Sequence, residues 1–335
     1  MFRQITLAGD PAARGLEHGR LLAAEIQQTV ELYLRYFARP EAELVSVAEQ
    51  YCRVVREYTS DYATEIEAIA EGADLPAWKL YALNARTEII NAATPECTAI
   101  YFARNRILGQ NWDWLAAMEA LCVIATIVRP DGHWIVTLIE PGMLAKIGMN
   151  SCGLGVCLNI LRQPHNGAGV PVHVVLRAVL DSMNIEQAKQ EIIRSGNDKA
   201  SHLLIGDARG QCYGMELAAQ GVHELTPTDG LLVHTNHYLT PGVAEPDPES
   251  TTRDRLARAQ SLGAAASDQS SDDMRRILLD MSDGERSINS TYRSRDDFAG
   301  MDAGTVATVV MDLPNNVMHV SQGNNPQRSF TRLEL

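Results

Sequence analysis

Cys97 and the peptide bond before it carry side-chain and backbone groups that could perform acyl chemistry. The thiol stands next to its own upstream carbonyl, that of Glu96. A thiol in this position can attack that carbonyl and move the acyl group from nitrogen to sulfur, and water can then cleave the thioester. The freed cysteine would carry an α-amine, whose ordinary pKa of about 7.7–8 suits a general base near neutral pH. One residue would then supply both nucleophile and base, without a distant histidine.

The position of Cys97 in the chain favours this chemistry over plain packing. A lone cysteine often serves as a small buried apolar side chain, and that interpretation stays open. Cys97, however, marks the point where the sequence pattern changes. Residues 10–92 show apolar side chains at helical spacing, whereas Thr98, Ile100 and Tyr101 favour a strand that begins at the thiol. A packing residue has no reason to mark this junction.

The remaining pattern predicts a fold of the α+β class. Helices are expected within residues 10–92, with a start signal at Asp10 and a stop at Gly72. Two more helical pairs are expected, over 170–195 and over 253–281. Short alternating runs separated by turns predict strands over 97–103, 106–112, 121–128, 133–140, 144–150, 154–160, 200–207, 210–217, 221–226, 231–236, 304–312 and 316–322. Because these strands come as hairpins, we expect two antiparallel sheets covered by helices and not a doubly wound parallel sheet.

Composition limits the classes of partner. The chain has 335 residues, 45% of them hydrophobic, which is enough for a large core without disulfides, and its six cysteines form no Cys-x-x-Cys pair. A net charge of −13 without a basic run argues against nucleic-acid binding. The start of the chain lacks a secretory signal, and the apolar runs are too short to cross a bilayer. We therefore expect a small-molecule substrate, neutral or cationic, no nucleic-acid or membrane partner, and by default a cytoplasmic location.

Several sequence blocks resemble one known family. The stretch ECTAIYFARNRILGQNWDW resembles the cleavage-site block of the acyl-coenzyme A:6-aminopenicillanate acyltransferase family, a group of cysteine N-terminal nucleophile (Ntn) hydrolases related to the choloylglycine hydrolases. GLEHGRLLAAEI and LYALNARTEII resemble its pro-segment helices, and IGMNSCGLGVCLNIL, VHTNHYL and STYRS resemble later site motifs. The resemblance implies a four-layer αββα sandwich. Residues 1–96 would be a helical pro-segment and residues 97–335 the catalytic chain, together forming one structural domain.

The resemblance also implies a role for each of five residues. Cys97 would be the nucleophile, and Asp113 would orient its amine. Asn236 would donate to the oxyanion, Asn159 would make a second oxyanion or substrate contact, and Arg293 would hold the surrounding charges. No cofactor or metal is implied. Taken alone, Asp113, Asn236 and Arg293 each have a plainer interpretation, as a turn, strand-end or solvated residue.

The implied reaction begins with cleavage between Glu96 and Cys97, after which the two chains stay associated. The mature enzyme would act through a Cys97 thioester on N-acyl amino compounds, on aminoacyl amides such as β-alanyl amines, or on acyl side chains of β-lactams. Gln110 stands where bile-salt hydrolases have arginine, which argues against a bile-salt substrate. Two alternatives stay open: a penicillin-type transfer from acyl-coenzyme A, and an uncleaved relative that only binds a small ligand. Glu96 motivates the second alternative, because the penicillin enzyme has glycine there.

Two other groups of residues invite a functional interpretation. His234 and His237 in HTNH suggest zinc, but the sequence offers no third ligand cluster and no His-Glu-x-x-His motif. Arg86 and Glu88 in NARTEI could form a buried structural pair or could support the site. We expect the structural role.

Overall fold

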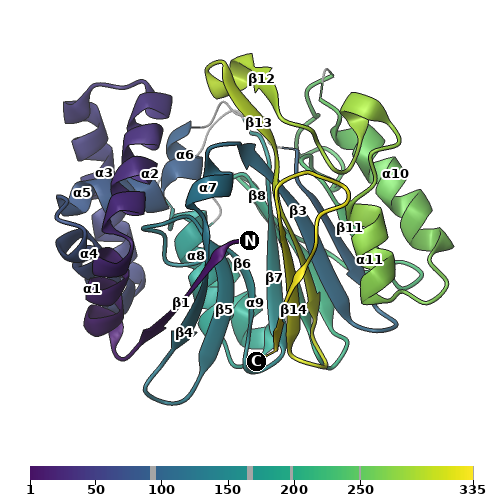
Figure 1. Cartoon of the computed structure of the whole chain (residues 1–335), viewed down its shortest axis with the longest axis horizontal. Coiled ribbons are helices and arrows are strands. Elements are labelled where there is room, and N and C mark those ends of the chain that lie inside the picture. Colours follow the sequence, from purple (N-terminus) through teal and green to yellow (C-terminus); the bar gives the residue numbers. More distant parts are fainter. Residues whose placement is uncertain (91–95, 164–168, 197–198, 249, 335) are drawn as a thin grey trace.

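The computed structural model describes residues 1–90, 96–163, 169–196, 199–248 and 250–334, which form two β-sheets with helices around them (Figure 1). The helices are α1 (Pro11–Leu21), α2 (Ala23–Phe37), α3 (Glu41–Tyr58), α4 (Ser60–Gly72), α5 (Ala77–Asn84), α6 (Arg86–Ile90), α7 (Met118–Leu121), α8 (Val172–Asp181), α9 (Ile185–Arg194), α10 (Thr252–Ala265) and α11 (Ser271–Leu278).

The first sheet contains eight strands and includes the start of the chain. Its order is β1 (Arg3–Ala8), β4 (Val123–Val128), β5 (Trp134–Ile139), β6 (Ile147–Asn150), β7 (Leu154–Ile160), β8 (Ser201–Asp207), β9 (Cys212–Ala218) and β10 (Gly221–Leu225). β1 pairs with β4 in parallel, and the other pairs are antiparallel.

The second sheet contains the strands around Cys97. Its order is β11 (Leu231–His234), β2 (Thr98–Phe102), β3 (Ile107–Leu115), β13 (Met301–Asp312), β14 (Val317–Gln322) and β15 (Thr331–Glu334), and β12 (Arg293–Arg295) pairs with β13. All nine residues of β3 are buried, so this strand runs through the interior. Such a strand needs apolar or fully hydrogen-bonded side chains on both faces.

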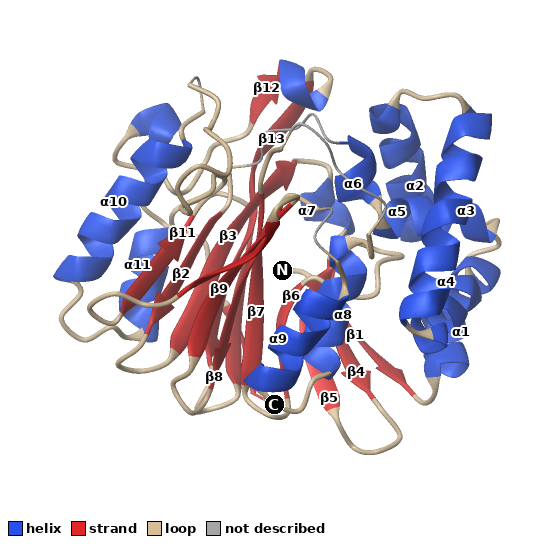
Figure 2. Ribbon diagram, turned by 180° about the vertical axis from the view of Figure 1, so that it is seen from behind, coloured by secondary structure: helices blue, strands red, loops and turns tan. Residues whose placement is uncertain are grey.

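The two sheets stack on each other and are covered by helices on their outer faces, as an αββα sandwich (Figure 2). α8 packs on β6 and β7, whereas α10 packs on β11 and β2 and α11 on β3 and β13. Gln110 of β3 ties the sheets together: its amide donates to the carbonyl of Leu158 in β7, and its oxygen accepts from the Leu158 N–H at 2.8 Å. Gln110 thus has a structural role between the layers.

The helices α1 to α5 lie beside this sandwich at one end (Figure 1). α1 and α4 cross closely, and a Cβ on Gly19 would lie 2.7 Å from the Gly72 Cα. A side chain at Gly19 would therefore force the two helices apart. Gly72, predicted as a helix stop, is the last residue of α4 and also lies at this crossing.

The predicted order of helices and strands is confirmed, with three differences. The sheets are not wholly antiparallel, because β1 pairs with β4 in parallel. β1 was not predicted as a strand, and only two of its six residues, Ile5 and Leu7, are buried. The short helix α7 and the short strands β12 and β15 were not predicted. The last part of the helical region expected within residues 10–92 consists of two short helices, α5 and α6, and residues 91 and 92 lie outside the described part of the chain. Within the described ranges, no helix has the length and apolar character needed to cross a membrane.

Candidate active site

Cys97 lies immediately before β2 and is buried, with 2% of its surface exposed. Its Sγ is 3.8 Å from the backbone oxygen of Asp113 in the neighbouring strand β3. Burial raises the pKa of the Cys97 thiol to about 11, and the nearby Asp113 carboxyl adds to the rise. The thiol of the intact chain is therefore protonated at neutral pH and needs a proton acceptor before it can attack a carbonyl.

Asp113 provides a carboxyl group with one oxygen to spare. It pairs in register with Thr305 of β13, beside a β-bulge. The Thr305 hydroxyl accepts from the N–H of Ser290 at 2.8 Å and donates to Asp113 Oδ1 at 2.6 Å. Asp113 Oδ2 is buried and has no hydrogen-bond partner among the described residues. Burial raises the pKa of Asp113 to about 7, and the Thr305 bond and the charge of Arg255 limit that rise.

Arg255, which the sequence did not single out, binds the backbone of Cys97. It is 1% exposed and lies on α10, where Thr252, Arg255, Ala259 and Gly263 are the buried residues. Its Nη1 donates to the carbonyl oxygen of Cys97 at 2.8 Å and to Thr98 Oγ1 at 3.1 Å. Burial lowers the pKa of the guanidinium, but arginine stays protonated in proteins, so this is a fixed positive charge beside Cys97.

The two asparagines implied by the resemblance lie on either side of this arginine. Asn159 Nδ2 donates to the Cys97 carbonyl oxygen at 3.3 Å, and its Oδ1 lies 3.0 Å from His202 Nδ1. Asn236 Oδ1 accepts from Arg255 Nη2 at 3.1 Å, whereas its Nδ2 donates to the Ile160 carbonyl at 3.0 Å. Asn159 therefore points an N–H at the backbone of Cys97, and the amide nitrogen of Asn236 is bonded to Ile160.

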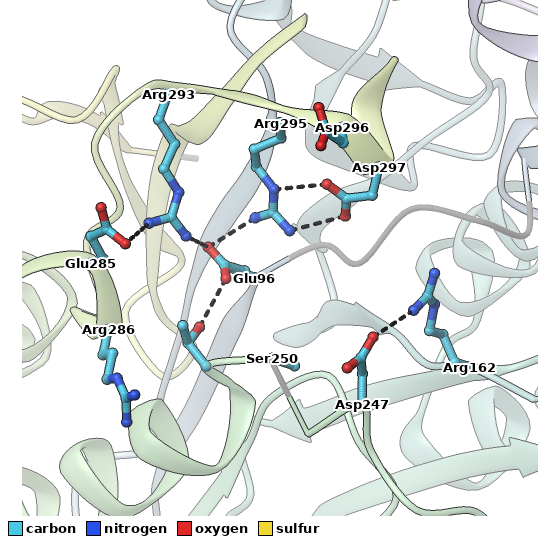
Figure 3. A pocket seen from close by; sticks show the side chains of 11 residues that line it. Glu96, Arg162, Asp247, Ser250, Glu285, Arg286, Arg293, Arg295, Asp296 and Asp297 are labelled. Carbon is cyan, nitrogen blue, oxygen red and sulfur yellow. Dashed lines mark hydrogen bonds and ion pairs between the residues drawn. The ribbon is translucent and has the colours of Figure 1, made fainter. Parts of the chain in front are cut away.

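Glu96, on the other side of the predicted scissile bond, is buried among basic and hydroxyl donors (Figure 3). Its Oε2 lies 3.0 Å from Arg295 Nη1 and 3.5 Å from Arg293 Nη2, and its Oε1 accepts from the Thr251 hydroxyl at 2.9 Å. The Thr251 oxygen also accepts from Arg255 Nε at 3.1 Å. A chain of hydrogen bonds thus links the Glu96 carboxylate to the arginine that holds Cys97.

These contacts line an open cavity of about 540 Å³ at the surface, next to the Glu96–Cys97 peptide bond. Arg293 lies at its wall, with 30% of its side chain exposed, and also pairs with Glu285 at 3.0 Å. The segment that carries Arg293 approaches β13 so closely that a Cβ on Gly304 would lie 2.8 Å from the Thr291 backbone. Arg293 thus reaches the site through Glu96, and Arg295 makes the shorter contact with the same oxygen.

The structure also shows the surroundings of the two histidines suggested as zinc ligands and of Arg86 and Glu88. His234 Nε2 lies 2.8 Å from Glu216 Oε1, and His237 Nδ1 lies 2.9 Å from Thr252 Oγ1. In the described part of the chain, no group of three or more His, Cys, Asp or Glu side chains is placed to hold a metal ion. Arg86 and Glu88 are both buried but have different partners: Arg86 pairs with Glu140, and Glu88 accepts from the Val172 N–H.

The structure therefore brings together Cys97, Asp113 and both asparagines, and places Arg293 one contact further out. Sequence reasoning missed residues that arrive from distant elements: Thr251, Arg255, Arg295 and Thr305. Arg255 had a usable signal, because a charged residue stands at the apolar spacing of α10. The positions of Arg295 and Thr305 depend on the strands that pair with β13, and that of Thr251 depends on the loop before α10, so the sequence carried no signal for them.

Known proteins resemble this chain over nearly its whole length. It is 28% identical to the "acyl-coenzyme A:6-aminopenicillanic-acid-acyltransferase 40 kDa form" of Emericella nidulans, over 97% of this chain and 94% of that protein. It is 23% identical to the "beta-alanyl-dopamine/carcinine hydrolase" of Drosophila melanogaster, over 92% and 90%.

Solved structures show the same fold. A variant of the conjugated bile acid hydrolase from Clostridium perfringens superposes with a TM-score of 0.51 at 13% identity, over 71% of this chain and 92% of that one. The αββα architecture is thus that of the Ntn hydrolases. Residues 102–327, about two thirds of the chain, match the family described as acyl-coenzyme A:6-aminopenicillanic acid acyl-transferase. The chain belongs to this family of acyltransferases and amide hydrolases.

Proposed function

We propose that this chain is a self-cleaving cysteine amidohydrolase or acyltransferase whose nucleophile is Cys97. The observation that carries the proposal is the arrangement around this residue. A buried thiol lies at the start of a strand, its carbonyl is held by Arg255 and Asn159, and an unpartnered carboxylate oxygen of Asp113 lies in the same buried site. An ordinary packing cysteine needs none of these polar neighbours, each of which costs free energy to bury.

Maturation, in this proposal, is an attack of Cys97 Sγ on the carbonyl carbon of Glu96. The thiol proton passes to the Asp113 carboxylate, whose raised pKa of about 7 suits a base at neutral pH. The C–N bond breaks as the C–S bond forms, and the nitrogen of Cys97 takes a proton and becomes an amine. Water then cleaves the thioester, which leaves a new carboxylate on Glu96 and a free thiol on Cys97. Residues 1–96 and 97–335 stay associated.

The mature site then uses the new α-amine as its general base. Asp113 Oδ2, which has no partner among the described residues of the intact chain, accepts a hydrogen bond from the ammonium form of that amine and fixes its direction. The thiolate attacks the acyl carbonyl of a small amide and forms a thioester on sulfur. Asn236 turns its amide from Ile160 toward the developing oxyanion, with Asn159 as the second donor; one such donor contributes roughly 2.7–4 kcal/mol. Water or an amine finally takes the acyl group.

The test of this proposal is intact-mass spectrometry of freshly purified protein. Two fragments with masses of residues 1–96 and 97–335 are expected, together with one intact chain for Cys97→Ala. Incubation with an acyl amide should then add one acyl group to the fragment that begins with Cys97. A fully active protein with an unbroken backbone, or turnover by the Cys97→Ala variant, would refute the proposal.

Acyl transfer from coenzyme A is a second candidate, favoured by the likeness to the Emericella nidulans acyltransferase. It uses the same Cys97 thioester but a different donor. Release of free coenzyme A that depends on an added amine acceptor would support transfer, whereas amine release from an amide in water alone would support hydrolysis. A single uncleaved chain that still binds small amides would instead favour the ligand-binding alternative.

A further inference from the structure

The cavity next to Cys97 contains a carboxylate that belongs to the chain itself. Glu96 is the residue whose carbonyl Cys97 would attack, so its side chain occupies the place of an acyl-group substituent during maturation. Its two oxygens are bound by Arg295 at 3.0 Å, Thr251 at 2.9 Å and Arg293 at 3.5 Å. Within the described residues, these are the donors that the Glu96 carboxylate meets in the intact chain.

The Cys97 sulfur takes part in both maturation and substrate turnover. We therefore expect the cavity to receive the acyl group of the substrate and not its amine group. Glu96 lies on the acyl side of the scissile bond, and Cys97 lies on the amine side. In maturation the acyl group bound to sulfur is the glutamyl group of Glu96, whereas in turnover it is the acyl group of the substrate. Once Glu96 has been released, a substrate acyl group takes its place on sulfur and faces the same arginines.

We propose that the preferred substrates are amides of an acyl group that carries a carboxylate at the glutamyl spacing, such as glutaryl or α-glutamyl amides. This inference rests on the proposed function of Cys97. In the glutaryl skeleton, as in Glu96, three carbon atoms separate the reacting carbonyl from the carboxylate. Arg295 and Arg293 supply the charge, and the Thr251 hydroxyl supplies a directional hydrogen bond. The negative net charge of the whole chain does not oppose this, because the residues that line the cavity, Glu96 apart, include as many arginines as carboxylates.

The reaction balances without a further reagent. Cys97 Sγ forms a bond to the glutaryl carbonyl carbon, and the carbonyl–nitrogen bond breaks. The thiol proton passes through the Cys97 amine to the departing amine. Water then replaces sulfur on the carbonyl and gives glutarate and the free thiol. The substrate's distal carboxylate stays ionised throughout, paired with Arg295.

The experiment compares glutaryl p-nitroanilide with its neutral analogue of equal length, 4-carbamoylbutanoyl p-nitroanilide. The ratio of their kcat/KM values does not depend on the fraction of cleaved enzyme. Because a hydrogen bond to a charged group stabilises more than a neutral one, the wild-type ratio should be at least about tenfold. Arg295→Gln should bring the ratio to about two or less. The Arg295→Gln variant also carries Glu96→Gln, so that no Glu96 carboxylate is left without its arginine during maturation. After cleavage, residues 97–335 of this variant differ from wild type at position 295 alone.

A matched control is Arg286→Gln, which removes a charge from the same cavity wall. Arg286 pairs with Asp254 at 3.0 Å, and among the described residues it makes no ion pair or hydrogen bond with Glu96. This variant should keep the wild-type ratio. A wild-type ratio near one, an equal loss in Arg286→Gln, or a cleaved protein that forms no glutaryl adduct on Cys97 would overturn the inference. If both anilides are hydrolysed and their kcat/KM values are nearly equal, only this inference fails. If the chain stays uncleaved and hydrolyses neither anilide, the proposed function itself is refuted.

Discussion

Arg86 and Glu140 form an ion pair that is fully buried, with 2.5 Å between Arg86 Nη2 and Glu140 Oε1. Lys146 Nζ lies 2.6 Å from the same oxygen. Burial alone would raise the pKa of Glu140, but the two cations outweigh it and hold that pKa well below its ordinary value. Arg86 precedes the proposed cleavage site and Glu140 follows it. The pair therefore joins the two chains of the proposed mature enzyme.

Replacing Glu140 by Gln should destabilise the chain strongly. The change leaves Arg86 and Lys146 as buried charges without their shared carboxylate, a loss of about 3–5 kcal/mol of unfolding free energy. Urea unfolding of the uncleaved Cys97→Ala protein, with and without Glu140→Gln, measures this loss. The exposed pair Arg253–Glu245 serves as a control, because Glu245→Gln should cost less than about 1 kcal/mol. Equal effects of the two changes would contradict the structural role given to Glu140.

Replacing Arg255 by Gln should slow self-cleavage at least about tenfold. The variant loses the charged hydrogen bond to the Cys97 carbonyl and the contact that orients Thr251 beside Glu96. A time course on denaturing gels measures the loss of intact chain. Arg258→Gln, one turn further along α10, removes a similar charge that pairs with Asp280, and should cleave at the wild-type rate. Thermal unfolding of both variants as Cys97→Ala proteins shows whether Arg255→Gln is folded.

The rate of self-cleavage should rise with pH through about 7 and then level off. Asp113 accepts the thiol proton only when ionised, and its pKa is raised to about 7. Thr305→Val removes the hydrogen bond that lowers this pKa, so the midpoint should move upward by about one pH unit. Thr308→Val, on the same strand, removes a hydroxyl bonded to Asn111 and should leave the midpoint in place. A Thr305→Val midpoint at or below that of wild type would exclude Asp113 as the acceptor.

The same carboxyl should make stability depend on pH. The pKa of Asp113 is about 7 in the folded chain against an ordinary value of 3.8, so the folded state binds more protons than the unfolded state between these values. Stability therefore falls as pH rises from about 4 to about 7. Between pH 5 and pH 8, the Cys97→Ala protein should lose roughly 2–3 kcal/mol relative to the same protein with Asp113→Asn. Identical pH profiles for the two proteins would contradict a buried Asp113 carboxyl that binds a proton up to about pH 7.

The sequence drew attention to Cys97, because the pattern of the chain changes from helical spacing to alternation at that residue. Asp113 was named only because its sequence block resembles the family's motif, and the structure places Cys97 Sγ 3.8 Å from the Asp113 backbone oxygen at one end of the β2–β3 hairpin. Arg255 and Thr305 could not be found in this way, because a helix and a strand from the last third of the chain bring them there. Sequence periodicity describes one element at a time and carries no information on which element packs against it.

The fold shows the same division. Hairpins and helical pairs were predictable because their partners are neighbours in sequence. The pairing of β1 with β4 joins residues more than a hundred positions apart, and six residues with two buried side chains give little warning of it. Glu96 is another residue whose surroundings the sequence did not predict. A glutamate before Cys97 suggested an uncleaved chain, whereas the structure shows its carboxylate bound by Arg295 and Thr251.

The place of β1 in the eight-stranded sheet has a consequence for how the enzyme can be produced. After cleavage, the 1–96 fragment would still supply an outer strand to a sheet built from the other fragment, so release of either would uncover the backbone edge of β4 and the apolar side chains beneath it. Synthesis of the two polypeptides from separate genes would therefore give insoluble or mispaired material. One open reading frame, folded first and cut afterwards, would assemble the proposed heterodimer without exposing this edge.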